Sequence, residues 1–140
     1  MGEIVETNIA LEKNLKLIEN EEYISIDTEF IRDNTYFSKL CLIQVASKNH
    51  SFIIDPLKED VKLDSLRKIL NKDTIIKIFH SGRQDMEIFY HLFGELPKPI
   101  YDTQIAAMVC GFGDQVSYEH LVNTLLNIRI DKSSRVSNWS

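Results

Sequence analysis

The sequence predicts an α/β domain: a mixed sheet, made of a three-strand antiparallel meander plus parallel strands, flanked by helices. Three observations predict this fold. Segments with the period-2 alternation of strands fill much of the first half, and strands alternate with helical segments in the second half. The 140 residues, of which 44% are hydrophobic and 26% charged, suit a globular domain with its own core. Residues 1–140 are therefore expected to form a single domain.

The first half of the chain predicts one helix followed by three strands. Asn8 is expected to cap the helix, in which apolar residues recur at helical spacing. The strands are expected at residues 23–30, 39–47 and 50–55. Residues 39–47 are apolar on both faces, as in a central strand. The loops between the three strands are short and polar, which favours an antiparallel meander.

In the second half, helical and strand patterns alternate. Helices are predicted near residues 63–70, 84–93, 103–110 and 118–126, and a fourth strand at 74–80. Gly94 is placed to end the second of these helices. This order is typical of parallel strands with helices packed on the sheet.

Composition excludes several classes of protein. No apolar run approaches the roughly 20 residues needed to cross a bilayer. The N-terminal residues include Glu3 and Glu6 rather than the basic start of a secretory signal. Cys41 and Cys110 lie in apolar segments without metal-binding spacing, so both are expected to be buried free thiols. A cytoplasmic protein without a membrane segment is expected.

The formal net charge of −5 argues against a surface coated with phosphate-binding Lys and Arg. It is still compatible with an enzyme that acts on nucleic acid. Acids that bind divalent cations count as negative in this sum, yet they present positive charge to a phosphate once loaded.

Three acids are expected at one end of the sheet. Asp27 and Glu29 are two residues apart near the C-terminal end of the first strand, so their side chains share a face. Asp85 lies in the first turn of the helix that follows the fourth strand. If these strands are neighbours, the three carboxylates meet and suit Mg²⁺ or Mn²⁺. The alternative is that Asp27 and Glu29 simply face water.

From about Tyr23 to Trp139 the chain resembles the ribonuclease D family, through "IDTEF", "YFSKLCLIQVA", "IDPL", "HSGRQDMEIFYHLFGELP", "YDTQIAA" and "DKSSRVSNW" in this order. This family belongs to the DEDD superfamily of 3′→5′ exonucleases, which have a ribonuclease H-like fold. The resemblance implies that Asp27, Glu29 and Asp85 are catalytic and hold two Mg²⁺ or Mn²⁺ ions. Asp27 would bridge both ions, Glu29 would bind the first and Asp85 the second. The implied reaction is hydrolysis at RNA 3′ ends, tRNA precursors among them, without a small-molecule cofactor.

Three further residues each have two interpretations, and a fourth has a structural interpretation alone. Phe30 would stack on a terminal base or only fill the core. His80 would contact substrate or bond to the backbone. Asp102 would be the N-cap of the following helix or an acid near the metal ligands. Gln44 is expected to pair with a neighbour in the core.

The resemblance implies a third motif, with a fourth acid and a water-positioning Tyr, beyond Trp139, and the sequence ends at Ser140. The C-terminal helices are accordingly expected to be missing, which would expose apolar surface and favour self-association. Such a chain is expected to bind a divalent ion but to hydrolyse RNA poorly. Lys132 and Arg135 near this end would contact phosphate or lie solvated. Two alternatives stay open: a non-catalytic nucleic-acid-binding remnant, and a DNA 3′→5′ exonuclease of the same superfamily.

Overall fold

The structure is a computed structural model, and it describes residues 2–32 and 38–130. Lys132 and Arg135, the two cations considered for phosphate contact, lie outside the described residues, as does Trp139. Within these ranges, no helix is long and apolar enough to cross a membrane.

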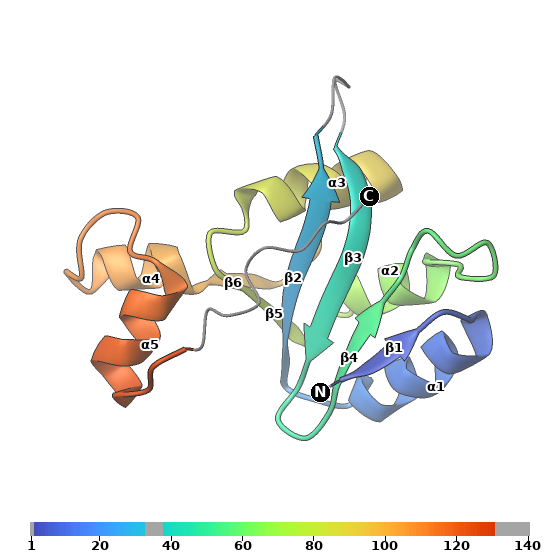
Figure 1. Cartoon of the computed structure of the whole chain (residues 1–140), viewed down its shortest axis with the longest axis horizontal. Helices are drawn as coiled ribbons and strands as arrows, with labels where there is room; N and C mark the ends of the chain where they lie inside the picture. The colour runs from blue at the N-terminus through green and yellow to red at the C-terminus, as the bar shows by residue number, and fades with distance from the viewer. Residues whose placement is uncertain (1, 33–37, 131–140) are drawn as a thin grey trace.

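The described residues form a six-stranded mixed sheet in the order β1-β4-β3-β2-β5-β6 (Figure 1). The strands are β1 (Glu3–Val5), β2 (Tyr23–Ile31), β3 (Lys39–Ala46), β4 (Ser51–Ile54), β5 (Ile76–Phe79) and β6 (Ile100–Asp102). β2, β3 and β4 form an antiparallel meander, whereas β5 and β6 run parallel beside β2. The predicted mixed sheet is confirmed. The sequence does not predict β1, which pairs with β4 in parallel, because three residues are too few to show a period.

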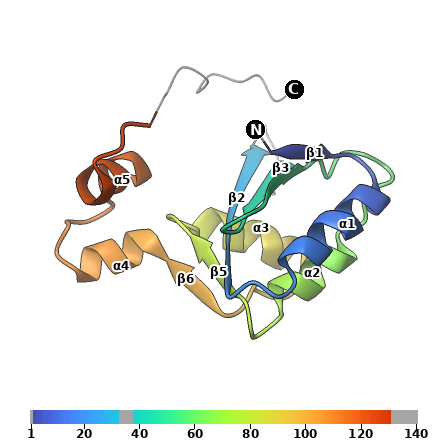
Figure 2. The ribbon, with the colours of Figure 1, turned by 90° about the horizontal axis from the view of Figure 1, so that it is seen from below.

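Helices in the described residues lie in two places. They are α1 (Asn8–Ile18), α2 (Asp64–Leu70), α3 (Arg83–Phe93), α4 (Thr103–Val109) and α5 (Tyr118–Leu126). Figure 2 shows α1, α2 and α3 on one side of the sheet, with α4 and α5 standing beside its β6 end. The five predicted helices are present.

Helix α1 is capped by Thr7, so the prediction of Asn8 as the cap is wrong. The hydroxyl of Thr7 accepts a hydrogen bond from the N–H of Ala10 at 3.2 Å. Asn8 is the first helical residue, and its side-chain oxygen accepts a bond from the N–H of Lys62 at 3.3 Å. Both residue types cap well, and the backbone at Thr7 is the extended conformation that an N-cap needs.

The core lies on the side of the sheet that α1, α2 and α3 cover. Ile24 and Ile26 of β2 and Ile43 of β3 are buried there, whereas Gln44 is exposed. The prediction that residues 39–47 form a central strand is confirmed, since β3 lies between β4 and β2. The prediction that Gln44 pairs with a neighbour in the core is wrong. Gln44 points to the face of the sheet that these helices leave open, where its register partner is Asp27.

Helices α4 and α5 pack on each other through a small apolar cluster of their own. It consists of Ala107, Val116 and Leu121, which are separate from the main core. Cys41 is buried as predicted, but the prediction that Cys110 is buried is wrong. Cys110 follows the last residue of α4, and the small apolar cluster does not extend over that end of the helix.

Lys77 of β5 is fully buried among the core side chains. Its ammonium donates hydrogen bonds to three backbone carbonyls, those of Lys72 at 2.8 Å, Ile75 at 2.6 Å and Lys98 at 2.6 Å. A buried cation is tolerated when its donors are used in this way. Lys77 therefore ties the segment after α2 and the segment before β6 to the start of β5.

We expect Lys77→Met to lower the free energy of unfolding by roughly 3 kcal/mol, because three carbonyls lose their charged donor. Urea unfolding followed by circular dichroism measures this change. Lys68→Met, at an exposed position of α2, is the matched control and should change stability little. A loss of under about 1 kcal/mol in the Lys77 variant would show that water or another donor replaces the ammonium.

Candidate active site

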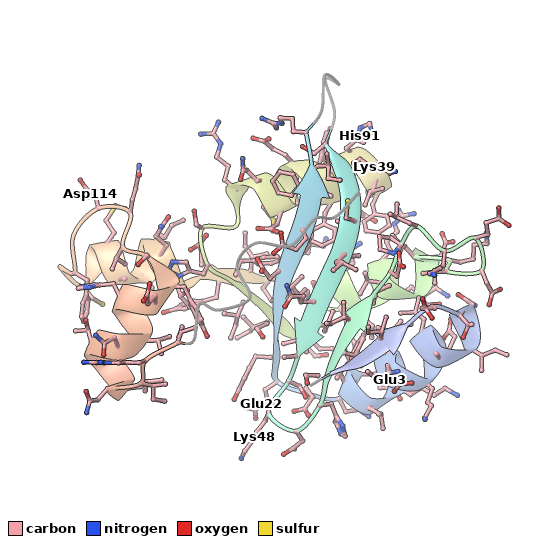
Figure 3. All side chains as sticks on the ribbon, in the orientation of Figure 1. Glu3, Glu22, Lys39, Lys48, His91 and Asp114 are labelled. Atoms are coloured by element: carbon pink, nitrogen blue, oxygen red, sulfur yellow. The ribbon has the colours of Figure 1, made fainter. Side chains whose placement is uncertain are left out.

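The end of β2 presents two acids on the open face of the sheet. Asp27 is exposed there and Glu29 is half-buried, while Thr28 between them is buried on the helix-covered side. A register shift follows between Glu29 and Phe30. In Figure 3, Lys39 marks the end of the sheet at which β2 finishes, and Glu22 and Lys48 mark the opposite end.

Asp85 reaches the same end of the sheet from α3. Strand β5 ends at Phe79, Ser81 takes the left-handed conformation with φ 59°, and Gly82 caps α3. A Cβ at Gly82 would lie 2.6 Å from Cβ of Phe79, so this turn has no room for a side chain. It places Asp85 in the first helical turn, where the helix dipole favours an acid.

Thr28 joins the two segments. Its N–H and its hydroxyl both donate to Oδ1 of Asp85, at 3.1 Å and 2.5 Å, and both residues are buried. The acid of the second predicted motif therefore lies directly against the residue between the two acids of the first.

The acids influence one another electrostatically. Desolvation, then the charges of Asp85 and Glu29, raise the pKa of Asp27 to about 6. Burial raises the pKa of Asp85 as well, although the hydrogen bonds from Thr28 oppose that shift. A bound cation would reduce the electrostatic repulsion among these carboxylates.

Oxygen-only donors fit a hard divalent cation. Both bonds from Thr28 go to Oδ1 of Asp85, so Oδ2 takes no part in them. Among the described residues, however, no three His, Cys, Asp or Glu side chains are arranged to hold a metal ion by themselves. The assignment of Asp27, Glu29 and Asp85 as ligands therefore stays a prediction.

Asp102 is the N-cap of α4, one of its two predicted roles. Its carboxylate accepts bonds from the N–H groups of Gln104 at 2.8 Å and Ile105 at 3.4 Å. It also accepts from Ser81 at 3.1 Å and Gly82 at 2.8 Å, which start α3. Asp102 thus fastens the beginnings of α3 and α4 to each other, and its charge contributes to the raised pKa of Asp85.

His80 connects three segments through its ring. Nδ1 lies 2.8 Å from the hydroxyl of Thr103, and Nε2 lies 3.0 Å from the carbonyl oxygen of Val116. Its ring also meets Tyr118 edge to face at 5.5 Å. These bonds match the structural interpretation of His80. A contact with substrate stays a prediction, as it does for Phe30, which is half-buried against the core.

Two grooves lie beside the sheet, and Asp27 lines the first of them. One, of about 660 Å³, follows the open face and is lined by Asp27, Gln44, His80 and Tyr118 among others. The second, of about 950 Å³, runs along the start of α3 and is lined by residues that include Arg32, Arg83, Gln104 and Ser117. Tyr118 and the two arginines are not predictable from sequence periodicity, because they come from separate places in the chain: the end of β2, the start of α3 and the start of α5.

Acids at the end of β2, with the helix-borne Asp85 beside them, are the donor types that metal-dependent hydrolases use for divalent cations. The chain belongs to the 3′–5′ exonuclease family, whose model matches residues 2–140. It is 42% identical over 140 residues to ribonuclease D of Bartonella henselae, and 48% identical over 124 residues to ribonuclease D of Jannaschia sp.. These alignments cover 100% and 86% of the chain. The chain spans about a third of the length of these relatives, 34% and 32%.

Solved structures agree with this family. Escherichia coli RNase D, described as an exoribonuclease involved in structured RNA processing, matches with a TM-score of 0.93 and 34% identity, over 99% of this chain and 37% of that one. Brucella melitensis NrnC with bound Mg²⁺ matches with a TM-score of 0.79 and 27% identity, over 99% and 67% of the two chains. The resemblance to ribonuclease D and its ribonuclease H-like fold are confirmed.

We expect Asp27→Asn to stabilise the metal-free protein at pH 7. The folded state raises the pKa of Asp27 to about 6, so stability is lost as the pH rises from about 4 to about 6. Asparagine carries no charge and removes this loss. Because Asp27 is exposed and screened by solvent, the gain should be on the order of 1 kcal/mol.

Urea unfolding in the presence of a chelator, at about pH 4 and pH 7, measures the difference between the variant and the wild type. The two proteins should differ little at the lower pH. A variant that is less stable than the wild type at pH 7 would show that Asp27 is not held in a repulsive cluster.

Proposed function

We propose that this chain contributes the metal-dependent site of a 3′→5′ exoribonuclease. The observation that supports it most is the pair of bonds from Thr28 to Asp85, because they bring the acids of two separate motifs to one end of the sheet. Membership of the 3′–5′ exonuclease family supports hydrolysis of the terminal phosphodiester bond as the reaction of this site.

Asp27, Glu29 and Asp85 would hold Mg²⁺ or Mn²⁺, two ions in a complete site. The bound Mg²⁺ of the Brucella melitensis relative supports this choice of cation. Such ions activate water and stabilise the leaving 3′-oxygen of a phosphodiester. Asp27 is exposed on the open face and is assigned the bridging position, with Glu29 on one ion and Asp85 on the other.

The substrate is proposed to be the 3′ end of RNA, with tRNA precursors as the specific case. Support comes from the Escherichia coli relative, an exoribonuclease involved in structured RNA processing. Arg32 and Arg83 along the second groove are suitable for phosphate contacts, although both lie near Glu87, at 3.8 Å and 3.5 Å. Phe30 and His80 are proposed to contact the terminal nucleotide.

Self-association is a further proposal. Large apolar side chains of α4 and α5 are exposed, among them Ile105, Val109, Leu125 and Leu126. Apolar groups gathered on two adjacent helices favour association with other protein surface. A cytoplasmic location is consistent with the absence of a membrane-spanning helix in residues 2–32 and 38–130, and it also stays a proposal.

Asp27→Asn tests the proposed function. The variant should bind Mn²⁺ more weakly, as followed by electron paramagnetic resonance of free Mn²⁺. In a chain extended through the family's third motif, the same substitution should slow Mn²⁺-dependent release of the terminal mononucleotide from 3′-labelled single-stranded RNA by at least about 10²-fold, because a bridging carboxylate serves both ions.

Asp114→Asn is the matched control, since Asp114 is exposed in the segment between α4 and α5, away from the sheet (Figure 3). It should leave both quantities unchanged. Mn²⁺ binding that is the same in wild type and Asp27→Asn would contradict the proposed site.

A further inference from the structure

We propose that Thr28 is a positioning residue of the site: it holds the carboxylate of Asp85 by one oxygen and presents the other to the cation. The inference rests on the proposed function, since it assigns Asp85 a metal to bind. Thr28 points to the helix-covered side of the sheet, whereas Asp27 points to the open face.

The alternation of β2 therefore separates the roles of these two neighbouring residues. Thr28 and Asp85 are only 6% and 7% exposed, so water does not supply the hydrogen bonds of their polar groups freely. A carboxylate in such a position needs donors from the protein.

The end of the pairing between β2 and β5 explains how Thr28 can meet this need. The parallel register of the two strands ends at the Ser25–Ile78 pair, and β5 then turns towards α3. Thr28 lies three residues beyond that pair. Its N–H therefore donates to Oδ1 of Asp85, at 3.1 Å, instead of to a β5 carbonyl.

The hydroxyl of Thr28 adds a second donor to the same atom, at 2.5 Å. Two donors from one residue fix both the position of Oδ1 and the rotation of the carboxylate about its bond to Cβ. The orientation of Oδ2 is then set by β2, the strand that also carries Asp27 and Glu29. Partners that orient a metal ligand typically contribute about 10- to 100-fold to metal affinity or activity.

The hydroxyl can be deleted without changing the shape of the residue. Thr28→Val keeps the branched side chain and the backbone N–H but removes one donor. Thr28→Ser keeps the donor and loses a methyl group. We expect Mn²⁺ affinity to fall about 10- to 100-fold in Thr28→Val and by less than about threefold in Thr28→Ser. Release of 3′ mononucleotides should follow the same order, with rescue by excess Mn²⁺.

Thr74→Val, at an exposed position before β5, is the control for the substitution itself and should bind Mn²⁺ as wild type does. Thermal unfolding without metal reports whether each variant is folded. If Thr28→Val does not fold, the pair Thr28→Ser and Thr28→Ala makes the same comparison, because serine keeps the hydroxyl and alanine removes it. The alanine variant should then bind Mn²⁺ at least about tenfold more weakly than the serine variant.

Three results are distinguishable. Mn²⁺ binding that depends on Asp27 and falls in the variants lacking the hydroxyl supports the role of Thr28. Binding that depends on Asp27 but is unchanged in those variants, whatever their thermal stability, overturns the positioning role and leaves the proposed function intact. Binding that does not depend on Asp27 overturns both.

Discussion

The candidate site depends on the contact between a strand and a helix that are far apart in the sequence. Thr28 of β2 donates two hydrogen bonds to Asp85 of α3, and both residues are buried. A buried carboxylate is costly unless it is satisfied, so this contact restricts where the first turn of α3 can lie. The exposed Asp27, one residue from Thr28, is thereby held within electrostatic reach of Asp85.

Other parts of the fold support that contact. Asp102 holds the turn at Ser81 and Gly82, from which α3 starts, and caps α4 with the same carboxylate. Lys77 fastens the start of β5, one strand away from the acids. The carboxylate of Asp102 and the ammonium of Lys77 form hydrogen bonds with backbone groups rather than with opposite charges. These bonds therefore fix the positions of chain segments. Asp27 and Glu29, on the open face of the sheet, are the acids proposed to bind the cation.

Much of this arrangement follows from the sequence, because periodicity and spacing are local. The alternation in β2 predicts that Asp27 and Glu29 share a face, and the motif after β5 predicts Asp85 on a helix. The exposures of Gln44 and Cys110 are not predictable in this way. Both depend on which face of an element the helices cover, a tertiary property. The link through Thr28 is likewise hidden, since a Thr in an alternating strand reads as an ordinary strand former.

We propose that the acids of β2 and α3 form one site for divalent cations, in which Asp27 is shared, Glu29 binds the first ion and Asp85 binds the second. Anomalous diffraction at the manganese absorption edge, from crystals soaked in millimolar Mn²⁺, tests it most directly. We expect an ion within coordination distance, about 2.2 Å, of Asp27 and Glu29, with Asp85 still bonded to Thr28 through Oδ1. Manganese bound only elsewhere, or Asp85 turned away from Thr28 while Asp27 binds no ion, would contradict it.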